Sequence, residues 1–428
     1  MTGDTIYALS SGNPPAAIAI VRISGPQAGL ALERLAGKIP EPRHAGLSAL
    51  RDPESGQTLD NALTLWFPGP GSSTGENLAE LHLHGGRAVV AAVSAVLGRF
   101  DGFRAAEPGE FTRRAFENGR IDLAEAEGLA DLLTAETESQ RRAALLLAGG
   151  GLSRQVEGWQ QRILGLSAAV EAALDFSDEV DVGDELPRGW LDRLRNLAGE
   201  MSAVLAGPPA ERLKEGIKVV IAGPPNAGKS TLLNRLAGRQ AAITSAIAGT
   251  TRDLVEAPTA LGGIPFLLVD TAGLRESTDE IETIGVGLAQ ASLEDADIIL
   301  WLGSPEDCPD RERAILVETR SDLAKPLHPE AEVHLSGATG EGVDRLVALL
   351  LDRSKMLIPQ EGEVAINRRH RSILLSSLTS LADAGAAHDL LIRSEYLRQA
   401  RGQLDRITGR AGVEDMLDSL FGAFCIGK

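Results

Sequence analysis

The pattern of apolar and polar positions changes character along the chain. Short apolar runs bounded by Gly or Pro predict strands at residues 17–21 and 62–67, and an alternating segment predicts a third strand at residues 80–84. From about residue 120 to 205, apolar residues recur at helical spacing, and the glycines at 149–151 separate the first long helix from the next. We therefore expect a mixed α/β domain followed by a helical segment.

A second α/β pattern begins near residue 216. Four short apolar runs separated by helical segments predict the strands of a doubly wound parallel sheet, at residues 217–222, 265–269, 298–302 and 315–317. Helical periodicity then returns from about residue 366 to 421. An α/β block between two helical blocks is most simply a domain inserted into a helical domain. The predicted order is an α/β domain, a helical segment, an inserted α/β domain and a second helical segment, at residues 1–118, 119–212, 213–358 and 359–428.

Composition narrows the classes of function. The 428 residues are 43% hydrophobic and 24% charged, as in globular proteins, which excludes bulk disorder. The formal net charge of −18 argues against a broadly cationic nucleic-acid coat but permits a local basic patch. The two cysteines, Cys308 and Cys425, exclude a disulfide framework and a four-Cys zinc site. No leader-like start and no run of about 18 apolar residues occur, so we expect a cytoplasmic protein without a membrane span.

Residues 223–230 carry the clearest chemical motif. They read Gly-Pro-Pro-Asn-Ala-Gly-Lys-Ser, follow a predicted strand and open a predicted helix, which is the context of a phosphate-binding loop. In such a loop, backbone N–H groups approach phosphate oxygens, Lys229 reaches the β- and γ-phosphates, and Ser230 offers a hydroxyl to Mg²⁺. The motif predicts a nucleoside triphosphate site.

Two further motifs extend this site. Residues 270–273, Asp-Thr-Ala-Gly, close a predicted strand and supply a carboxylate for Mg²⁺ and a backbone N–H for the γ-phosphate. Between the two motifs, residues 248–253 contain two threonines, of which Thr251 is favoured as a second hydroxyl ligand of Mg²⁺ and Thr250 is the alternative.

The base is predicted to be guanine. Where Asn-Lys-x-Asp normally reads guanine, the chain has Thr319, Arg320 and Asp322, which keeps the discriminating aspartate. A Thr hydroxyl can still form a hydrogen bond and an Arg stem can still cover the base. Residues 336–338, Ser-Gly-Ala, follow a predicted strand and would close over the base. The order of the motifs favours GTP over ATP, while the Thr and Arg replacements leave the affinity open.

The hydrolytic step lacks its usual residue. Leu274 occupies the position at which Ras-type GTPases place a water-orienting Gln, and its side chain cannot orient water. Asn226 could present an amide oxygen to a monovalent cation placed where an arginine finger would lie. Glu282 either positions the water or is an ordinary solvated carboxylate on a helix face.

Taken together, these features resemble the MnmE (TrmE) family of bacterial tRNA-modification GTPases over almost the whole chain. The segments that carry the resemblance, besides the nucleotide motifs, are residues 4–8 (DTIYA), 20–25 (IVRISG), 80–86 (ELHLHGG), 108–116 (PGEFTRRAF) and 424–428 (FCIGK). The resemblance implies an N-terminal folate-binding α/β domain that forms a homodimer, a discontinuous helical domain and an inserted Ras-like P-loop G domain.

The resemblance also implies site residues. The folate contacts would be Arg22, Glu80, Arg120 and Lys428. The G domain would be potassium-dependent, with K⁺ ligands at Asn226, Ser245, Ile247 and Thr250, Mg²⁺ ligands at Ser230 and Thr251, and Glu282 as the catalytic residue that positions water. The GTP contacts would be Asn226, Ala227, Gly228, Lys229, Ser230, Thr231, Ser245, Ala246, Ile247, Ala248, Gly249, Thr250, Thr251, Asp270, Thr271, Ala272, Gly273, Thr319, Arg320, Asp322, Ser336, Gly337 and Ala338.

Members of this family act with the FAD- and NADH-using partner MnmG (GidA), in a heterotetramer-type complex. Together they install an aminomethyl-type group, such as carboxymethylaminomethyl, at C5 of the wobble uridine of certain tRNAs. The carbon comes from a tetrahydrofolate derivative, 5,10-methylene or 5-formyl, and the second substrate is glycine or ammonium. Cys425 is a candidate catalytic thiol, because uracil C5 chemistry often uses a nucleophile at C6, or else a packing residue.

Two surface features keep more than one interpretation. His82 and His84 lie two residues apart on one strand face, without an evident third metal ligand, which favours a structural or folate-side role. Residues 366–410 hold eight Arg and four acids, which indicates either a solvated helix face or a tRNA-backbone patch. The rival functions are a regulatory GTPase of the ribosome-assembly type and a folate-dependent one-carbon transferase with a regulatory G domain.

Overall fold

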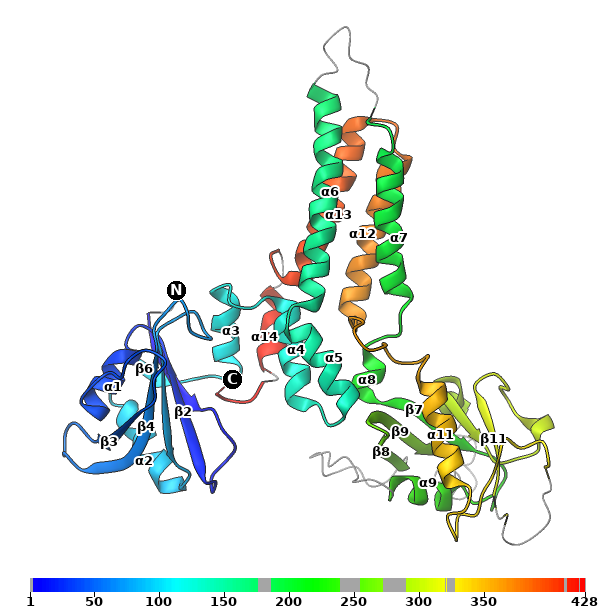
Figure 1. Ribbon diagram of the computed structural model, residues 1–428, viewed down its shortest axis with the longest axis horizontal. Helices are drawn as coiled ribbons and strands as arrows, with labels where there is room; N and C mark the ends of the chain where they lie inside the picture. The colour runs from blue at the N-terminus through cyan, green and yellow to red at the C-terminus, as the bar shows by residue number, and fades with distance from the viewer. Residues whose placement is uncertain are drawn as a thin grey trace, which may run out of the picture. The chain divides into compact units, whose positions relative to one another are not determined.

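The computed structural model describes residues 3–175, 186–238, 255–271, 290–319, 321, 328–411, 414–422 and 424–427. The chain forms two compact units (Figure 1). The first comprises Met1–Ala130 and Thr408–Lys428, and the second comprises Asp131–Ile407. The multidomain arrangement of α/β and helical parts agrees with the fold class predicted from the sequence.

The first unit is built on a six-stranded sheet. Its strands, in spatial order, are β3 (Gly46–Arg51), β4 (Thr58–Phe67), β5 (Leu78–His84), β2 (Ile18–Ser24), β1 (Thr5–Leu9) and β6 (Phe103–Ala105). All neighbours are antiparallel except β1 and β6, which run parallel. Helices α1 (Ala28–Ala36) and α2 (Arg87–Leu97) bury one face, where alternate strand residues such as Val21 and Leu81 are inaccessible to solvent. The three strands predicted from the pattern overlap β2, β4 and β5.

The opposite face of this sheet carries exposed apolar side chains. Leu47 is 71% exposed, Leu63 is 44% exposed and Ile18 is also exposed. Leu47 lies directly opposite Leu63, and Leu63 lies opposite His82, so these side chains share one face. An open apolar sheet face next to polar residues is typical of a surface that another molecule covers.

Helices complete the first unit. These are α3 (Glu110–Glu117), α4 (Leu123–Thr134), which continues into the second unit, and α14 (Glu414–Gly422). A small core joins them, in which Leu123 and Ala126 pack with Phe421 and Phe424. The C-terminal segment therefore packs with elements that precede residue 130.

In the second unit, helices from two separated parts of the chain lie side by side (Figure 1). They are α6 (Gly151–Asp175), α7 (Trp190–Ala206), α12 (Arg368–Ala386) and α13 (Leu390–Thr408). The hydroxyl of Ser377 donates to the Ala400 carbonyl between α12 and α13, and Gln160 donates to Asp405 between α6 and α13. The shorter helices α5 (Glu138–Ala148) and α8 (Glu211–Glu215) precede the inserted domain. Among the described residues, no helix has the length and apolar character needed to cross a membrane.

The inserted domain is a second six-stranded sheet. Its spatial order is β12 (Val333–His334), β11 (Ala314–Glu318), β10 (Ile298–Trp301), β7 (Ile217–Ala222), β9 (Ile264–Asp270) and β8 (Val255–Leu261). All neighbours are parallel except the edge pair of β8 and β9. The sheet packs with α9 (Lys229–Ala237) and α11 (Val343–Ser354). All four strands predicted here from apolar runs are present. Pro209 and Ile366 form a parallel bridge where the chain enters and leaves this domain.

Candidate functional site

The predicted phosphate loop connects β7 to α9 and adopts an unusual backbone conformation. Gly223, Asn226 and Gly228 have φ of 148°, 59° and 92°. A Cβ atom at Gly223 would lie 3.0 Å from the Leu302 carbonyl carbon, so a side chain there would crowd the residue that follows β10. The loop conformation therefore requires the glycines of the motif, and it directs the N-terminus of α9 toward the loop.

Lys229 and Ser230 begin α9 and reach in two directions. The Nζ of Lys229 donates to the carbonyls of Gly223 and Pro224, at 3.0 and 2.8 Å, and the residue is buried. The Oγ of Ser230 donates to the Asp270 Oδ2 at 2.5 Å. The ammonium group thus lies across the loop that would hold phosphates, while the hydroxyl lies beside a carboxylate.

Asp270 comes from β9, whose register brings the second motif to the first. Asp270 lies opposite Ile221 of β7, and the Thr271 hydroxyl donates to the Ile221 carbonyl at 3.0 Å. Both side chains are buried. A hydroxyl and a carboxylate oxygen in contact are donors that suit Mg²⁺, so the residues present fit this ion.

Thr319 contacts the phosphate loop directly. Its hydroxyl donates to the Ala227 carbonyl at 2.6 Å. Thr319, where the sequence predicts the base-reading segment, is therefore connected to the loop. The 336–338 segment is held by α9, because Arg235 donates to the carbonyls of Gly337 and Ala338. Ser336 is fully buried, and its Oγ accepts from the Thr339 N–H at 3.1 Å.

The other predicted nucleotide residues, and one predicted folate residue, lie outside the described residues. They are Ser245, Ala246, Ile247, Ala248, Gly249, Thr250, Thr251, Ala272, Gly273, Leu274, Glu282, Arg320, Asp322 and Lys428. The structure therefore brings together the phosphate loop, Asp270, Thr271, Thr319 and the 336–338 segment.

In the first unit, Arg22 and Glu80 form a cross-strand pair. Arg22 of β2 lies directly opposite Glu80 of β5, and its Nε and Nη2 both donate to the Glu80 Oε1, at 3.1 and 2.8 Å. The His82 Nε2 lies 3.2 Å from the Glu80 Oε2. Burial opposes ionisation of Glu80, but the hydrogen bonds and charge of Arg22, with those of His82, hold the pKa of this carboxyl below its usual value. The site therefore presents an ionised carboxylate and a guanidinium on the open sheet face.

Arg120 lies beside the loop that contains Thr74 and Gly75, and this loop contacts the end of β2, the strand that carries Arg22. Its Cγ would lie 3.2 Å from a Cβ built on Gly75. The adjacent Thr74 hydroxyl is 2.8 Å from the Ser24 hydroxyl at the end of β2. No hydrogen bond or ion pair joins Arg120 to Arg22 or Glu80 in the described part of the chain.

The C-terminal tail docks onto the first unit and leaves Cys425 exposed. Ile426 forms an antiparallel bridge with Pro108, and Gly427 (φ 93°) lies so close to β1 that an added Cβ would be 2.1 Å from the Leu9 carbonyl oxygen. Leu9 follows Ala8, which pairs with Arg22 across β1 and β2. The fold thus brings the tail to the end of β1, beside the strand that carries Arg22.

Sequence reasoning missed a buried ion cluster in the first unit. Arg114 of α3 lies 3.0 Å from Glu110, 3.1 Å from Asp4 and 3.1 Å from Glu76. Glu76 also accepts a hydrogen bond from the Ser24 hydroxyl at 2.8 Å. The spacing of Glu110 and Arg114, four residues apart on a helix, was the one signal that could have suggested part of this cluster.

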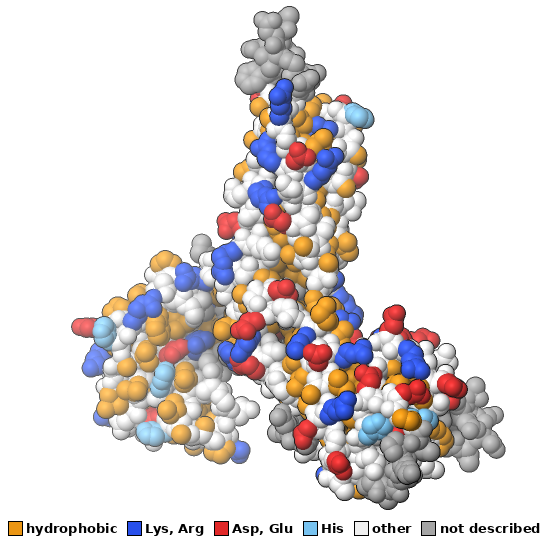
Figure 2. All heavy atoms as spheres, turned by 45° about the vertical axis from the view of Figure 1, so that its right-hand side comes forward, with side chains coloured by type: hydrophobic (Ala, Val, Ile, Leu, Met, Phe, Trp, Pro, Cys, Tyr) orange, Lys and Arg blue, Asp and Glu red, His pale blue; other side chains and the backbone are white. Residues whose placement is uncertain are grey.

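The arginines at residues 366–410 divide into different roles. Arg369, Arg371 and Arg393 donate to backbone carbonyls near the ends of neighbouring helices. Arg398 forms an ion pair with Glu395, and Arg401 is exposed. Figure 2 shows Lys and Arg side chains along the helical bundle, interspersed with acids. Three of the eight arginines therefore stabilise helix ends.

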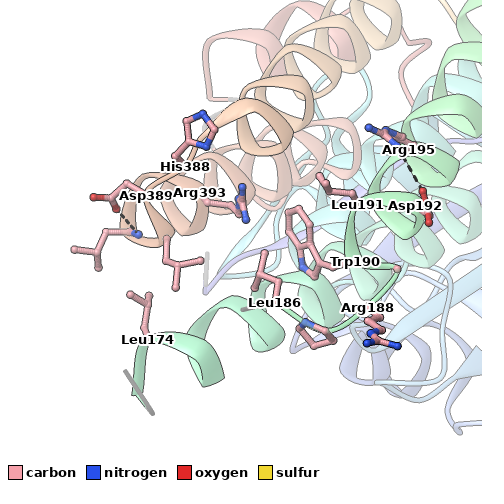
Figure 3. A pocket seen from close by; sticks show the side chains of 14 residues that line it. Leu174, Leu186, Arg188, Trp190, Leu191, Asp192, Arg195, His388, Asp389 and Arg393 are labelled. Atoms are coloured by element: carbon pink, nitrogen blue, oxygen red, sulfur yellow. Dashed lines mark hydrogen bonds and ion pairs between the residues drawn. The ribbon is translucent and has the colours of Figure 1, made fainter. Parts of the chain in front are cut away.

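A hollow of about 700 Å³ lies at the end of the bundle (Figure 3). Leu174, Leu391 and Arg188 are among its lining residues. Arg393 lies over the Trp190 ring at 5.0 Å, which fixes two side chains of the wall. None of the predicted site residues lines this hollow, so its size does not identify it as the nucleotide site or the folate site.

Comparisons with known proteins cover the whole chain. A family model described as the MnmE helical domain matches residues 123–425, and one described as the GTP-binding protein TrmE N-terminus matches residues 5–120. The tRNA modification GTPase MnmE of Erythrobacter litoralis (strain HTCC2594) is 56% identical over 427 residues, which is 99% of this chain and 100% of that protein. The tRNA modification GTPase MnmE of Rhizorhabdus wittichii is 57% identical over 430 residues, 99% of this chain and 97% of that protein. The solved G domain of the T. maritima FeoB iron transporter is 26% identical and covers 32% of this chain and 98% of its own, with a TM-score of 0.25.

Proposed function

Since the chain belongs to the MnmE family of tRNA modification GTPases, and is thus a GTP hydrolase, we propose that it uses GTP hydrolysis to drive wobble-uridine modification. The product would be a carboxymethylaminomethyl group at C5 of the wobble uridine of certain tRNAs. The observation that carries this proposal is identity above one half over 99% of the chain to relatives with that name.

In the proposed GTP site, three of the described residues have defined tasks at the phosphates and Mg²⁺. Lys229 would bind the β- and γ-phosphates, in place of the loop carbonyls that now hold its ammonium group. Ser230, with Thr251, would hold Mg²⁺, and Asp270 would orient this ion through water. Bound Mg²⁺ would neutralise charge that develops on the phosphates.

The water would be positioned by Glu282, since Leu274 cannot do so. Asn226, Ser245, Ile247 and Thr250 would hold K⁺, and this ion would supply the positive charge that an arginine finger supplies elsewhere. The φ of 59° at Asn226 is a left-handed conformation that Asn tolerates better than most residues, which fits an Asn at this point of the loop.

For the first unit we propose a tetrahydrofolate derivative, 5,10-methylene or 5-formyl, as ligand of Arg22, Glu80, Arg120 and Lys428. A pterin ring has adjacent N–H donors and a carbonyl acceptor, which complement the ionised Glu80 and the Arg22 guanidinium. The open apolar sheet face around this pair supports a homodimer, because a second copy would cover both the exposed leucines and the ligand.

The remaining chemistry would involve a thiol of this chain and two partners. Cys425 is exposed on the docked tail and would act as the thiol that adds to C6 of the uracil. The redox step would require FAD and NADH on the partner MnmG. The tRNA backbone would contact exposed arginines of α13, and charge reversal at Arg398 and Arg401 together is then expected to weaken tRNA binding at low salt.

Deletion of the gene, followed by mass spectrometry of the nucleosides of bulk tRNA, tests the proposal. Loss of the modified wobble uridine is expected, and its return requires the gene on a plasmid. Normal modified uridines would instead favour the regulatory GTPase. Turnover of GTP in potassium and in sodium buffers tests the cation separately, since equal rates would remove the role of K⁺ but not that of the family.

A further inference from the structure

We propose that His82 is a positioning residue, which fixes the Glu80 carboxylate so that its Oε2 can accept a hydrogen bond from a folate-type ligand. This inference rests on the folate function proposed above for Arg22 and Glu80. His82 itself has no assigned role in that proposed folate site.

The two oxygens of Glu80 have different surroundings. Oε1 accepts from both the Nε and the Nη2 of Arg22, at 3.1 and 2.8 Å. Since a carboxylate oxygen has two lone pairs, these two bonds occupy the acceptor positions of Oε1. Oε2 has the His82 Nε2 at 3.2 Å, which leaves one lone pair for a ligand. A ligand donor would therefore bind the oxygen that His82 orients.

The protonation of the His82 ring follows from its partner. An ionised carboxylate only accepts hydrogen bonds, so the Nε2 of His82 must carry the hydrogen and donate it to Oε2. In the described part of the chain, Glu80 is the only hydrogen-bond partner of this ring. The cross-strand neighbours of His82 are the apolar residues Ile20 and Leu63.

The arrangement needs both contacts because a Glu side chain has several rotatable bonds. Arg22 holds one oxygen and leaves the carboxylate able to turn about that oxygen. His82 holds the other oxygen from two residues along the same strand and on the same face. A group fixed in this way loses less conformational entropy when the ligand binds, which is why a support of this kind increases affinity.

His84 provides a matched comparison. It is the same residue type on the same face of β5, but its Nδ1 pairs with Asp60 at 2.7 Å rather than with Glu80. A substitution at His84 therefore changes the surface of β5 without removing a contact to Glu80.

The test is isothermal titration of the full chain with (6S)-5-formyltetrahydrofolate, comparing wild type with His82→Leu, His82→Gln and His84→Leu. His82→Leu is expected to weaken binding about tenfold, because the Glu80 carboxylate is no longer held in place and ordering it then costs free energy on binding. His82→Gln is expected to bind within about threefold of wild type, since its amide keeps a donor at a similar reach. His84→Leu is expected to bind like wild type, and thermal unfolding of all four proteins checks that each is folded.

The outcomes separate this inference from the folate function. If wild type does not bind the probe, the folate function fails and the role of His82 fails with it. If wild type binds and folded His82→Leu binds equally well, His82 alone is refuted and the folate function stands. If His82→Gln is as weak as His82→Leu, donation to Oε2 is not what the histidine contributes, and the inference is overturned as well.

Discussion

Removal of the Arg114 guanidinium should strongly destabilise the first unit. Its side chain is only 3% exposed and contacts Asp4, Glu76 and Glu110 within 3.1 Å. These carboxylates come from the residue before β1, the loop before β5, and α3, so one cation joins three parts of the fold. The substitution Arg114→Met keeps a long apolar stem and removes the charge.

The size of the effect follows from burial and charge. Breaking a buried ion pair by removing one partner costs about 3–5 kcal/mol, because the remaining charge stays desolvated without compensation. Arg104 also contacts Asp4 and Glu110, so it offsets part of the loss at those two residues but not at Glu76. We therefore expect a loss near the lower end, about 3 kcal/mol in the free energy of opening the first unit.

The loss of stability caused by Arg114→Met should depend on pH, and the direction of this dependence can be predicted. Burial raises the pKa of both Asp4 and Glu110, but Arg104 and Arg114 outweigh it and the pKa values are lowered. Carboxyls of lowered pKa stabilise the fold above their unfolded pKa, about 4, and lose this contribution as pH falls through their folded values. Without Arg114 their pKa values rise, so the difference between variant and wild type should shrink as the pH falls through about 4 and below.

Hydrogen exchange of amides in β1 and α3 measures the opening of this unit separately from the second one. Arg113→Met is the matched control, because the neighbouring Arg113 is 41% exposed and its pairs with Glu117 and Asp418 lie at the surface. Exposed pairs of this kind contribute about 1 kcal/mol or less. The reasoning is refuted if Arg114→Met costs no more than Arg113→Met at pH 7, or if its deficit grows in acid.

Three further predictions test other parts of the chain. Leu63→Asp should convert the proposed dimer to a monomer in sedimentation, whereas Leu164→Asp, at 45% exposure against 44%, should not; equal behaviour would argue against the open sheet face as the dimer contact. Gly427→Ala should undock the tail and speed amide exchange at its bridge with Pro108, because the added Cβ would lie 2.1 Å from a carbonyl oxygen of β1. Gly422→Ala, with open space around it, should leave this exchange unchanged. Thr319→Val should weaken GTP binding about tenfold, because it leaves the Ala227 carbonyl of the phosphate loop unpaired, while Thr319→Asn should restore the affinity. Unchanged binding by the Val variant would rule out a role for this hydrogen bond.

The sequence predicted best the parts where local pattern and burial coincide. The run at 217–222 matches β7 in full, because a strand buried on both faces is mostly apolar, and its one charged residue, Lys218, lies near its start and pairs with Asp295. The Gly break at 149–151 was placed correctly, since α5 ends at Ala148 and α6 begins at Gly151, but the long helix predicted before it is two helices, because Thr137 caps the start of α5 after α4 ends at Thr134. By contrast, the edge strand β8 contains Pro258 and polar residues, so the apolar pattern did not predict it.

The functional sites differ in the same way: some could be predicted from local sequence and others could not. The phosphate loop was predictable because its backbone conformation requires glycine at residues 223 and 228. The residue types in this short segment therefore indicate its geometry. The pairing of Arg22 with Glu80 depends on strand register, and the cluster around Arg114 depends on residues far apart in the chain. Long-range register of this kind is set by the packed sheet as a whole, and single residue types do not reveal it.

The structure also changes what the charge of the chain means for RNA. The arginine-rich segment at 366–410 has a net positive formal charge, yet Arg369, Arg371 and Arg393 bind backbone carbonyls that helix ends leave unpaired. Arg398 is already paired with Glu395, so a phosphate must compete with that carboxylate. Each phosphate contact contributes about 0.9 to the slope of log K against log salt, so the segment should produce a shallower salt dependence than eight arginines would suggest. A tRNA contact on these helices would therefore depend on shape and on partner surfaces more than on summed charge, as expected for a chain with a net charge of −18.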